Sequence, residues 1–521
     1  MLFNSYIFVF LFLPVTLAGW YFLNRIKWHK AAYAFLIGMS LWFYGYFNAN
    51  YLLLILISII GNYLISMGLT FFEKSSKSEP IMDKASANKN NIANDSQLKY
   101  ARKIAIVLGL LLNLGILFYF KYYDFFIENI NNVFKLGLTT KNILLPLGIS
   151  FFTFQQMSFI IERGWGWSEH YTLLEYAAFV TFFPQLIAGP IVLHSELIPE
   201  LSKASKSGLS LDNMYDGVVS FVFGLAKKVL LADTLALVAN YGFDHAPYLD
   251  TFSVITVMVA YALELYFDFS GYSDMAIGLA AMFGIKLPVN FNSPYKSSSL
   301  KALWGRWHIT LTRFMTTYVY IPLGGNRKGR VRTLINVFIV FVLSGLWHGA
   351  AWTYVVWGAL TGLIVVWDNL GIIGFDAKEK HPARIILPKW LGVIFTNFAF
   401  TMLLIPFRSP NLTTAWQICK DFFVGWTGNL YKLAGSTMDI PEIYLIKQVM
   451  TRIAPDKMTI TYVIVMFLII AIGIVVVTRR NVREILSLYR GKSWLNAVVV
   501  MLFVYSVISF SQVSTFIYFN F

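Results

Sequence analysis

The sequence is poor in charged residues and poorest in acidic ones. Charged residues make up 13% of the 521 positions, with 27 Asp and Glu against 42 Lys and Arg, whereas hydrophobic residues make up 57%. Ordinary globular domains have about 25% charged residues, because folding leaves a large surface in contact with water. This shortage excludes a soluble enzyme, a disordered chain and a fibrous repeat, and it predicts a polytopic membrane protein.

Cysteine and the familiar catalytic motifs are also scarce. Cys419 is the only cysteine, which excludes an internal disulfide and a multi-cysteine metal site. We weigh a role for this thiol as a covalent acyl carrier against that of a small buried hydrophobic side chain, and favour the second. HExxH, Walker A, GxSxG and paired CxxC motifs are absent, and we therefore expect no metal ion and no permanently bound cofactor.

The net charge of +15 is best explained by cytoplasmic loops, in which Lys and Arg accumulate in membrane proteins. The first apolar run, residues 6–23, has no basic region before it and is followed by Arg25, Lys27 and Lys30. We interpret it as an uncleaved span with the N-terminus outside. Residues 73–103 contain seven basic and four acidic residues and are rich in Ser and Asn, which predicts a flexible cytoplasmic loop.

Long apolar runs continue through the rest of the chain. They predict an all-α, polytopic membrane helical bundle with about 11 transmembrane helices, plus re-entrant or interfacial helices where a run is too short to cross. The runs at 143–161, 175–192, 252–269 and 275–285 are treated as separate helices. We expect one integral membrane domain over residues 1–521. No internal repeat is visible in the sequence, which weakens an inverted-repeat transporter.

Residues 286–332 differ from the rest of the chain, because these 47 residues contain nine Lys and Arg and no acid. Aromatic residues are interleaved with the charges. A basic cytoplasmic loop explains the charge equally well. The functional interpretation is a site for a phosphorylated ligand, with cations facing the phosphates and aromatic rings available for stacking. The candidate ligand-binding residues on this interpretation are Lys296, Arg306, Arg313, Trp304 and Asn292.

Two of the seven histidines lie in apolar surroundings. His348 ends an apolar run, and in a helix Ser344 and Gly345 lie on its face, so that open space is expected beside its ring. An ionisable group at membrane depth is costly and usually functional. An interhelical hydrogen bond is the structural alternative. His308 follows Trp307 at the start of a weakly polar run, and we regard both histidines as candidate catalytic residues.

Three acids, Glu264, Asp268 and Asp274, lie in one short stretch. Glu264 and Asp268 are four residues apart and share one face of a helix. A proton relay is one interpretation of this pair. We favour the other, in which buried acids tie helices together or pair with the basic stretch.

Six stretches carry a resemblance to a known family. They are 145–155 (LPLGISFFTFQ), 183–190 (FPQLIAGP), 266–274 (YFDFSGYSD), 290–295 (NFNSPY), 304–308 (WGRWH) and 344–349 (SGLWHG). On these motifs the chain resembles the membrane-bound O-acyltransferases (the MBOAT family), in the bacterial branch typified by the alginate O-acetylation membrane protein. The resemblance is densest over residues 145–357, which we expect to form the catalytic core.

The resemblance implies a helical bundle with a tunnel between a cytoplasmic donor entrance and an extracytoplasmic acceptor entrance. It places the family's catalytic histidine at His348 and its second recurrent polar position at His308. The implied donor is acetyl-CoA, whose phosphates would contact Lys296, Arg306 and Arg313. The implied acceptor is an extracytoplasmic polysaccharide, either an alginate-like exopolysaccharide or peptidoglycan. A periplasmic or surface acetyltransferase partner and a location in the bacterial inner membrane are also implied.

Acyl transfer to a hydroxyl needs a base, and an unperturbed histidine with a pKa of about 6.5 suits neutral pH. We expect His348 to act as general base, and His308 to position the reactants or to stabilise the oxyanion. Two other classes stay open. A transporter or flippase for a glycan or lipid-linked sugar also uses buried ionisable residues, and a non-catalytic scaffold of a polysaccharide export complex needs neither histidine.

Overall fold

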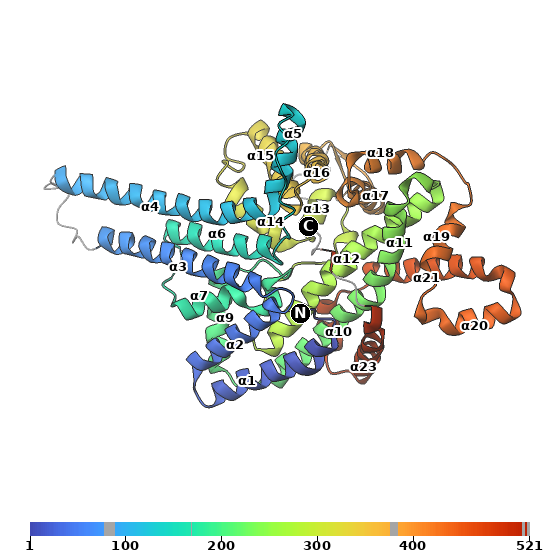
Figure 1. Cartoon of the computed structure of the whole chain (residues 1–521), viewed down its shortest axis with the longest axis horizontal. Coiled ribbons are helices and arrows are strands. Elements are labelled where there is room, and N and C mark those ends of the chain that lie inside the picture. Colours follow the sequence, from blue (N-terminus) through green and yellow to red (C-terminus); the bar gives the residue numbers. More distant parts are fainter. Residues whose placement is uncertain (78–88, 168, 376–383, 513–515, 518–521) are drawn as a thin grey trace. The chain divides into compact units, whose positions relative to one another are not determined.

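The computed structural model describes residues 1–77, 89–167, 169–375, 384–512 and 516–517, and these are almost entirely helical (Figure 1). The expected all-α class is confirmed. The strands of the described residues are β1 (Ile373–Gly374) and β2 (Ile385–Ile386), which form one short parallel pair. The chain divides into two compact units, Met1–Val218 with Ala276–Pro288, and Val219–Met275 with Val289–Phe521. The expectation of a single domain stays a prediction.

The first unit consists of helices from the N-terminal part of the chain. α3 and α4 lie side by side in it (Figure 1). Its elements are η1 (Phe8–Phe12), α1 (Leu13–Arg25), α2 (His29–Gly45), α3 (Asn50–Lys77), α4 (Lys89–Leu117), η2 (Phe118–Tyr122), α5 (Tyr123–Phe134), α6 (Ile149–Trp165), α7 (Leu173–Thr181), α8 (Phe183–Leu186), α9 (His194–Lys206) and the start of α10 (Leu211–Ala226).

The second unit carries both candidate histidines, and in it α15 packs along α16. Its larger elements are η3 (Lys227–Ala232), α11 (Asp233–Asp244), α12 (Thr251–Met282), α13 (Leu300–Trp304), α14 (Ile309–Met315), η6 (Thr316–Tyr320), α15 (Arg330–His348), α16 (Trp352–Leu370), α17 (Lys389–Arg408), α18 (Leu412–Asp421), α19 (Asn429–Thr437), α20 (Tyr444–Ile453), α21 (Met458–Thr478), α22 (Val482–Tyr489) and α23 (Ser493–Ile508). Helix α12 belongs to this unit as far as Met275. Its short 3₁₀ turns are η4 (Ala246–Tyr248), η5 (Pro294–Lys296), η7 (Pro441–Ile443), η8 (Pro455–Lys457) and η9 (Ser509–Gln512).

Eight helices of the described residues are long and apolar enough to cross a membrane. The protein is therefore an integral membrane protein of several spans, as its composition predicts. The expected number of about 11 spans stays a prediction, since shorter apolar helices such as α23 can also insert. The eight segments are Phe8–Arg25, Asn50–Thr70, Tyr100–Phe134, Thr251–Met282, Arg330–His348, Trp352–Leu370, Lys389–Arg408 and Pro455–Thr478.

The separation of runs 252–269 and 275–285 was wrong, because both belong to the continuous helix α12. The polar residues between the runs stay helical, and the charged residue among them is paired within the second unit. Asp274 pairs with Lys227 at 2.6 Å. Gly271 lies so close to α10 that an added Cβ would be 2.8 Å from the carbonyl oxygen of Gly224. A polar, glycine-containing stretch here marks a close helix contact rather than a break.

Two other expected helices are divided or shortened. The run 175–192 is interrupted between α7 and α8, because Pro184 lies in the first turn of the short helix α8, where proline is tolerated, and cannot continue α7. The run 143–161 becomes helical only at Ile149, after Gly148 with a φ of +72°. The expected loop 73–103 contains the end of α3 and the first part of α4. Helix therefore occupies more of it than expected, residues 78–88 lie outside the described residues, and its flexibility stays a prediction.

Candidate active site

His348 is the last residue of α15 and is buried, with 6% of its surface exposed. A helical side chain leans toward the preceding turn, and Nδ1 of the ring lies 2.6 Å from the carbonyl oxygen of Ser344. A carbonyl oxygen only accepts hydrogen bonds, so the proton of the neutral ring is on Nδ1. The lone pair is therefore on Nε2, which is the form that a general base requires.

The space beside His348 differs from the expectation. Gly345 does not leave an opening, because a Cβ there would lie 3.0 Å from the Cα of Gly358 in α16. The small residue serves the close packing of α15 on α16. Aromatic rings surround the imidazole instead, with centroids 5.1 Å away for Trp357 and 5.4 Å for Phe407. Gly345 therefore does not provide the expected open space, and the room at this ring depends on aromatic side chains.

His308 is the N-cap of α14 and has a φ of +46°, which is uncommon for a residue other than glycine. Asn290 holds this conformation, because its carbonyl oxygen accepts the Ile309 N–H at 2.9 Å. Its side-chain Oδ1 accepts the backbone N–H of Thr310 at 3.3 Å and lies 3.1 Å from Nδ1 of His308. Since Oδ1 is an acceptor, Nδ1 of His308 is the donor, and Nε2 carries the lone pair.

The oxyanion role expected of His308 does not fit this arrangement. Burial and the neighbouring His348 hold the pKa of His308 well below its usual range, so the ring is neutral at physiological pH. A neutral ring whose N–H is given to Asn290 has no N–H on Nε2 for an oxyanion. A positioning role for His308 stays open. Asn290 itself was missed as a site residue, although it lies in one of the six motif stretches.

The two histidines line one small cavity of about 20 Å³, which we call the histidine cavity. Such a volume holds about one water molecule. The expected tunnel therefore stays a prediction, because an acyl chain needs more room than the cavity has in this structure. Three lining residues belong to α17, outside the expected core 145–357. The lining residues are Leu265, Phe269, Trp304, Trp307, His308, Leu311, His348, Trp357, Phe400, Leu404 and Phe407.

Two indole groups of the histidine cavity are available as donors. The Nε1 atoms of Trp304 and Trp357 are buried and have no hydrogen-bond partner among the described residues. An indole N–H is a donor only, and an unpaired buried donor costs about 1–3 kcal/mol. The two rings are neighbours, with centroids 6.0 Å apart. The histidine cavity thus combines basic ring nitrogens with neutral donors, which is the set that addition to a carbonyl uses.

A second, larger pocket of about 340 Å³ lies in the same unit and is lined by charged side chains. We call it the polar pocket. Lys228 bridges Asp268 at 2.6 Å and Asp233 at 2.8 Å, which confirms that Asp268 ties helices together, as Asp274 does through Lys227. Glu264 shares the helix face of Asp268, as its spacing predicts. It is 3% exposed, and its Oε2 has no hydrogen-bond partner among the described residues.

The polar pocket adjoins the histidine cavity through two aromatic residues. Tyr354 lines the polar pocket, and Phe407 lines the histidine cavity. Their ring centroids are 5.3 Å apart, and Phe407 is in turn 5.4 Å from the imidazole of His348. These two rings are therefore packed between the charged pocket and the candidate base.

The structure brings only part of the predicted ligand-binding set together. Asn292 and Arg306 contact each other, since the Asn292 N–H donates to the Arg306 carbonyl oxygen at 2.9 Å and the guanidinium reaches the Asn292 carbonyl at 3.4 Å. Trp304 lies in the histidine cavity instead. Lys296 ends η5 and Arg313 lies in the last turn of α14. Binding of a phosphorylated ligand by these residues stays a prediction.

Cys419 lies in α18 and packs against the hydrophobic core of the second unit. Burial raises the pKa of its thiol, which lowers the thiolate fraction. Cys419 is not among the residues that line the histidine cavity. These observations favour a small, partly buried hydrophobic side chain over an acyl carrier.

Comparison with known proteins gives consistent matches. Residues 136–404, which include both histidines, match the model of the membrane-bound O-acyltransferase family. The chain is 34% identical to the peptidoglycan O-acetyltransferase of Helicobacter pylori, over 90% of this chain and 89% of that protein. It is 35% identical to the probable alginate O-acetylase AlgI of Pseudomonas aeruginosa, over 83% and 77%. It is 30% identical to the teichoic acid D-alanyltransferase of Streptococcus thermophilus, over 53% and 71%.

Proposed function

The chain belongs to the membrane-bound O-acyltransferase family and is an acyltransferase, and from this premise we propose that it is a membrane O-acetyltransferase for an extracytoplasmic polysaccharide. The donor is cytoplasmic acetyl-CoA, and the acceptor is a hydroxyl of peptidoglycan or of an alginate-like exopolysaccharide. The names of the two relatives at 34% and 35% identity support both acceptors. A periplasmic or surface partner, the inner membrane and an external N-terminus remain parts of the proposal.

One observation carries the mechanism: His348 donates Nδ1–H to the Ser344 carbonyl and keeps the Nε2 lone pair on a cavity with two unpaired indole donors. His348 Nε2 takes the proton of the acceptor hydroxyl while the oxygen forms a bond to the thioester carbon. The indole N–H groups of Trp304 and Trp357 donate to the oxyanion. The carbon–sulfur bond then breaks, and the imidazolium returns its proton to the CoA thiolate.

The position of the polar pocket supports an acceptor that arrives from outside. The guanidinium of Arg330, at the start of α15, donates to the Leu370 carbonyl at the end of α16, so both termini lie at one end of these helices. This end carries the basic stretch that the positive-inside rule assigns to the cytoplasm. The polar pocket is at the other end, where it is lined by Thr353 at the start of α16 and Arg408 at the end of α17.

Chemistry also supports the polar pocket as the acceptor side. The unpaired Oε2 of Glu264 accepts hydrogen bonds, and Arg408 donates them, as recognition of a sugar hydroxyl requires. The pocket volume of about 340 Å³ suits a single sugar unit. CoA is large and multiply anionic, and its transfer through hydrocarbon is prohibitive. Separate donor and acceptor sides allow the acetyl group to pass without its carrier.

The decisive experiment measures thiol release from acetyl-CoA by the purified protein with an acceptor polysaccharide. We expect His348→Ala to lower turnover by about 10²–10⁴, the usual contribution of a general base. His245→Ala is the matched control, because this exposed imidazole stacks on Tyr241 at 4.1 Å and lines none of the pockets described above. Normal turnover in His348→Ala refutes the assignment. Absence of any thiol release with acceptor and partner supplied favours the transporter or scaffold alternatives.

A further inference from the structure

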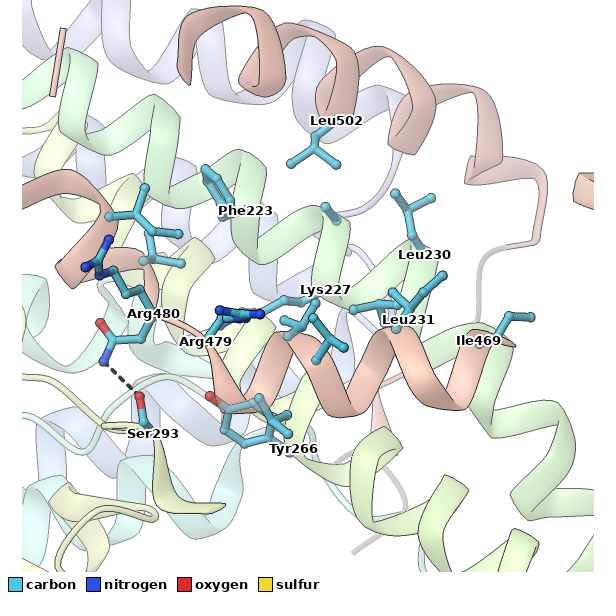
Figure 2. A pocket seen from close by; sticks show the side chains of 18 residues that line it. Phe223, Lys227, Leu230, Leu231, Tyr266, Ser293, Ile469, Arg479, Arg480 and Leu502 are labelled. Carbon is cyan, nitrogen blue, oxygen red and sulfur yellow. Dashed lines mark hydrogen bonds between the residues drawn. The ribbon is translucent and has the colours of Figure 1, made fainter. Parts of the chain in front are cut away.

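A third pocket of the second unit is a long, mostly apolar groove of about 490 Å³. It is bordered by α10, η3, α21, α22 and α23, and Figure 2 shows it from close by. In this view Arg480 and Ser293 lie at one end, and Leu230 and Ile469 lie at the other. None of its lining residues is acidic. The groove therefore has one cationic end and one apolar end, as an amphiphilic ligand requires.

The cations at the mouth are Arg479 and Arg480, which are both exposed. Arg479 forms no ion pair with an acid of the described residues, and Arg480 contacts the hydroxyl and ring of Tyr489. Lys227 also lines the groove, but its charge is compensated by Asp274 at 2.6 Å. The two arginines are thus the cations that can receive an anionic group.

The length of the groove matches one half of a bilayer. Ile469 and Arg479 are ten residues apart, and a rise of 1.5 Å per residue separates them by about 15 Å. This is about half of the roughly 30 Å hydrocarbon core. The wall between them includes Ile472 and Val476, which are exposed on the most apolar of the eight candidate spans. The groove is therefore open to the acyl chains of the bilayer.

The mouth lies where anionic headgroups are found. Residues 479–492 connect α21 to α23 and contain five Lys and Arg and one acid, which assigns them to the cytoplasmic side. α22 within this segment is amphipathic, with Val482 and Ile485 facing the groove and Arg483 exposed. Short amphipathic helices with basic faces lie in the headgroup region of anionic membranes.

We propose that this groove binds one anionic glycerophospholipid of the cytoplasmic leaflet, with its phosphate on Arg479 and Arg480 and an acyl chain along α21. An acetyl donor does not explain the apolar half of the groove, because its acyl group has only two carbons. A lipid uses both halves, and its acyl chain packs against Leu230 and Ile469. The site is distinct from the histidine cavity, with which it shares no lining residue.

The test is lipid binding by the detergent-purified full chain, counted by native mass spectrometry. Phosphatidylglycerol is titrated against phosphatidylcholine of identical acyl chains. We expect phosphatidylglycerol alone to bind one-to-one, and Arg479→Gln with Arg480→Gln to weaken it by about thirtyfold, at about fivefold per cation. The matched control is Arg483→Gln with Lys492→Gln, which removes the same charge from exposed positions outside the groove.

A second variant tests the apolar half without changing charge. Val476→Trp adds a large ring to an exposed wall of the groove, and we expect it to weaken phosphatidylglycerol binding while the protein stays monodisperse. If the double arginine variant does not fold, Val476→Trp by itself tests whether a lipid binds in the groove. Any one of three results overturns the proposal. They are an equal loss of lipid binding in the control pair, equal binding of phosphatidylcholine, and normal phosphatidylglycerol binding by Val476→Trp. Displacement of the lipid by acetyl-CoA also overturns it, because the groove is then part of the donor site.

Discussion

Trp357→Phe removes one indole N–H from the histidine cavity and leaves an aromatic ring beside His348. The N–H has no hydrogen-bond partner among the described residues, and the Trp357 and His348 ring centroids are 5.1 Å apart. Trp304→Phe makes the same change on the neighbouring wall. If these groups stabilise the oxyanion, activity and stability respond differently to their removal.

The expected loss of activity is large, whereas the expected change in stability is small. Loss of one oxyanion donor lowers kcat by about 10²–10³. Removal of an unpaired buried N–H recovers about 1–3 kcal/mol of unfolding free energy. The smaller ring leaves a cavity of roughly 40 Å³, which costs about 1 kcal/mol at about 24 cal/mol per Å³. The two stability contributions oppose each other, so the free energy of unfolding should change little.

The assay is kcat from thiol release, with the melting temperature measured on the same samples. Trp20→Phe is the matched control, because Trp20 is fully buried in α1 and its indole N–H also lacks a partner among the described residues. It should reproduce the stability effect and leave kcat unchanged. If both Trp304→Phe and Trp357→Phe keep kcat within about threefold of the original, the indole groups are core residues and the oxyanion assignment fails.

Three further predictions concern neighbouring residues. Because the pKa of His308 is lowered in the folded protein, the unfolded chain takes up the imidazole proton first as pH falls, and the free energy of unfolding should decline below about pH 6.5. Asn290→Asp places a carboxylate beside the ring and favours the imidazolium, so it should reduce this decline in melting curves from pH 5.5 to 7.5. Lys228→Met leaves the buried carboxylate of Asp268 and the partly buried one of Asp233 without their cation. It should destabilise the fold by about 3–5 kcal/mol, seen as a lower melting temperature, whereas an unchanged melting temperature contradicts the helix-tying role. The double variant Arg306→Gln with Arg313→Gln should raise the KM for acetyl-CoA and leave kcat unchanged. An unchanged KM would mean that these two cations serve only to orient the protein in the membrane.

Much of the site was accessible from the sequence because membrane burial restricts polar residues. A histidine at the end of an apolar run is costly unless it is used, which singled out His348. The i,i+4 spacing placed Glu264 and Asp268 on one helix face, and both line the polar pocket. The helical class followed from composition, since a chain in lipid must satisfy its backbone within helices or a closed barrel. These conclusions depend on the spacing of residues along a helix and on the free-energy cost of burying polar groups. Both follow from the order of residues in the sequence.

Other features depend on contacts between residues far apart in the chain. The Asn290 side chain fixes the tautomer of His308 from 18 positions away, and a tautomer depends on its partner rather than on its neighbours in sequence. Phe400, Leu404 and Phe407 bring α17 to the histidine cavity from outside the expected core. The space beside Gly345 is filled by α16. Sequence spacing specifies which residues share a face, but not which element covers that face.

The sequence by itself determined the membrane environment, the helical class and the scarcity of polar residues that made the two histidines conspicuous. Tertiary structure alone decided what each side of α12 does. Tyr266 faces the apolar groove, Leu265 and Phe269 face the histidine cavity, and Glu264 and Asp268 face the polar pocket. The physical reason is that successive helical residues point about 100° apart, so one helix presents several faces. Only the packing of its neighbours gives each face its chemistry.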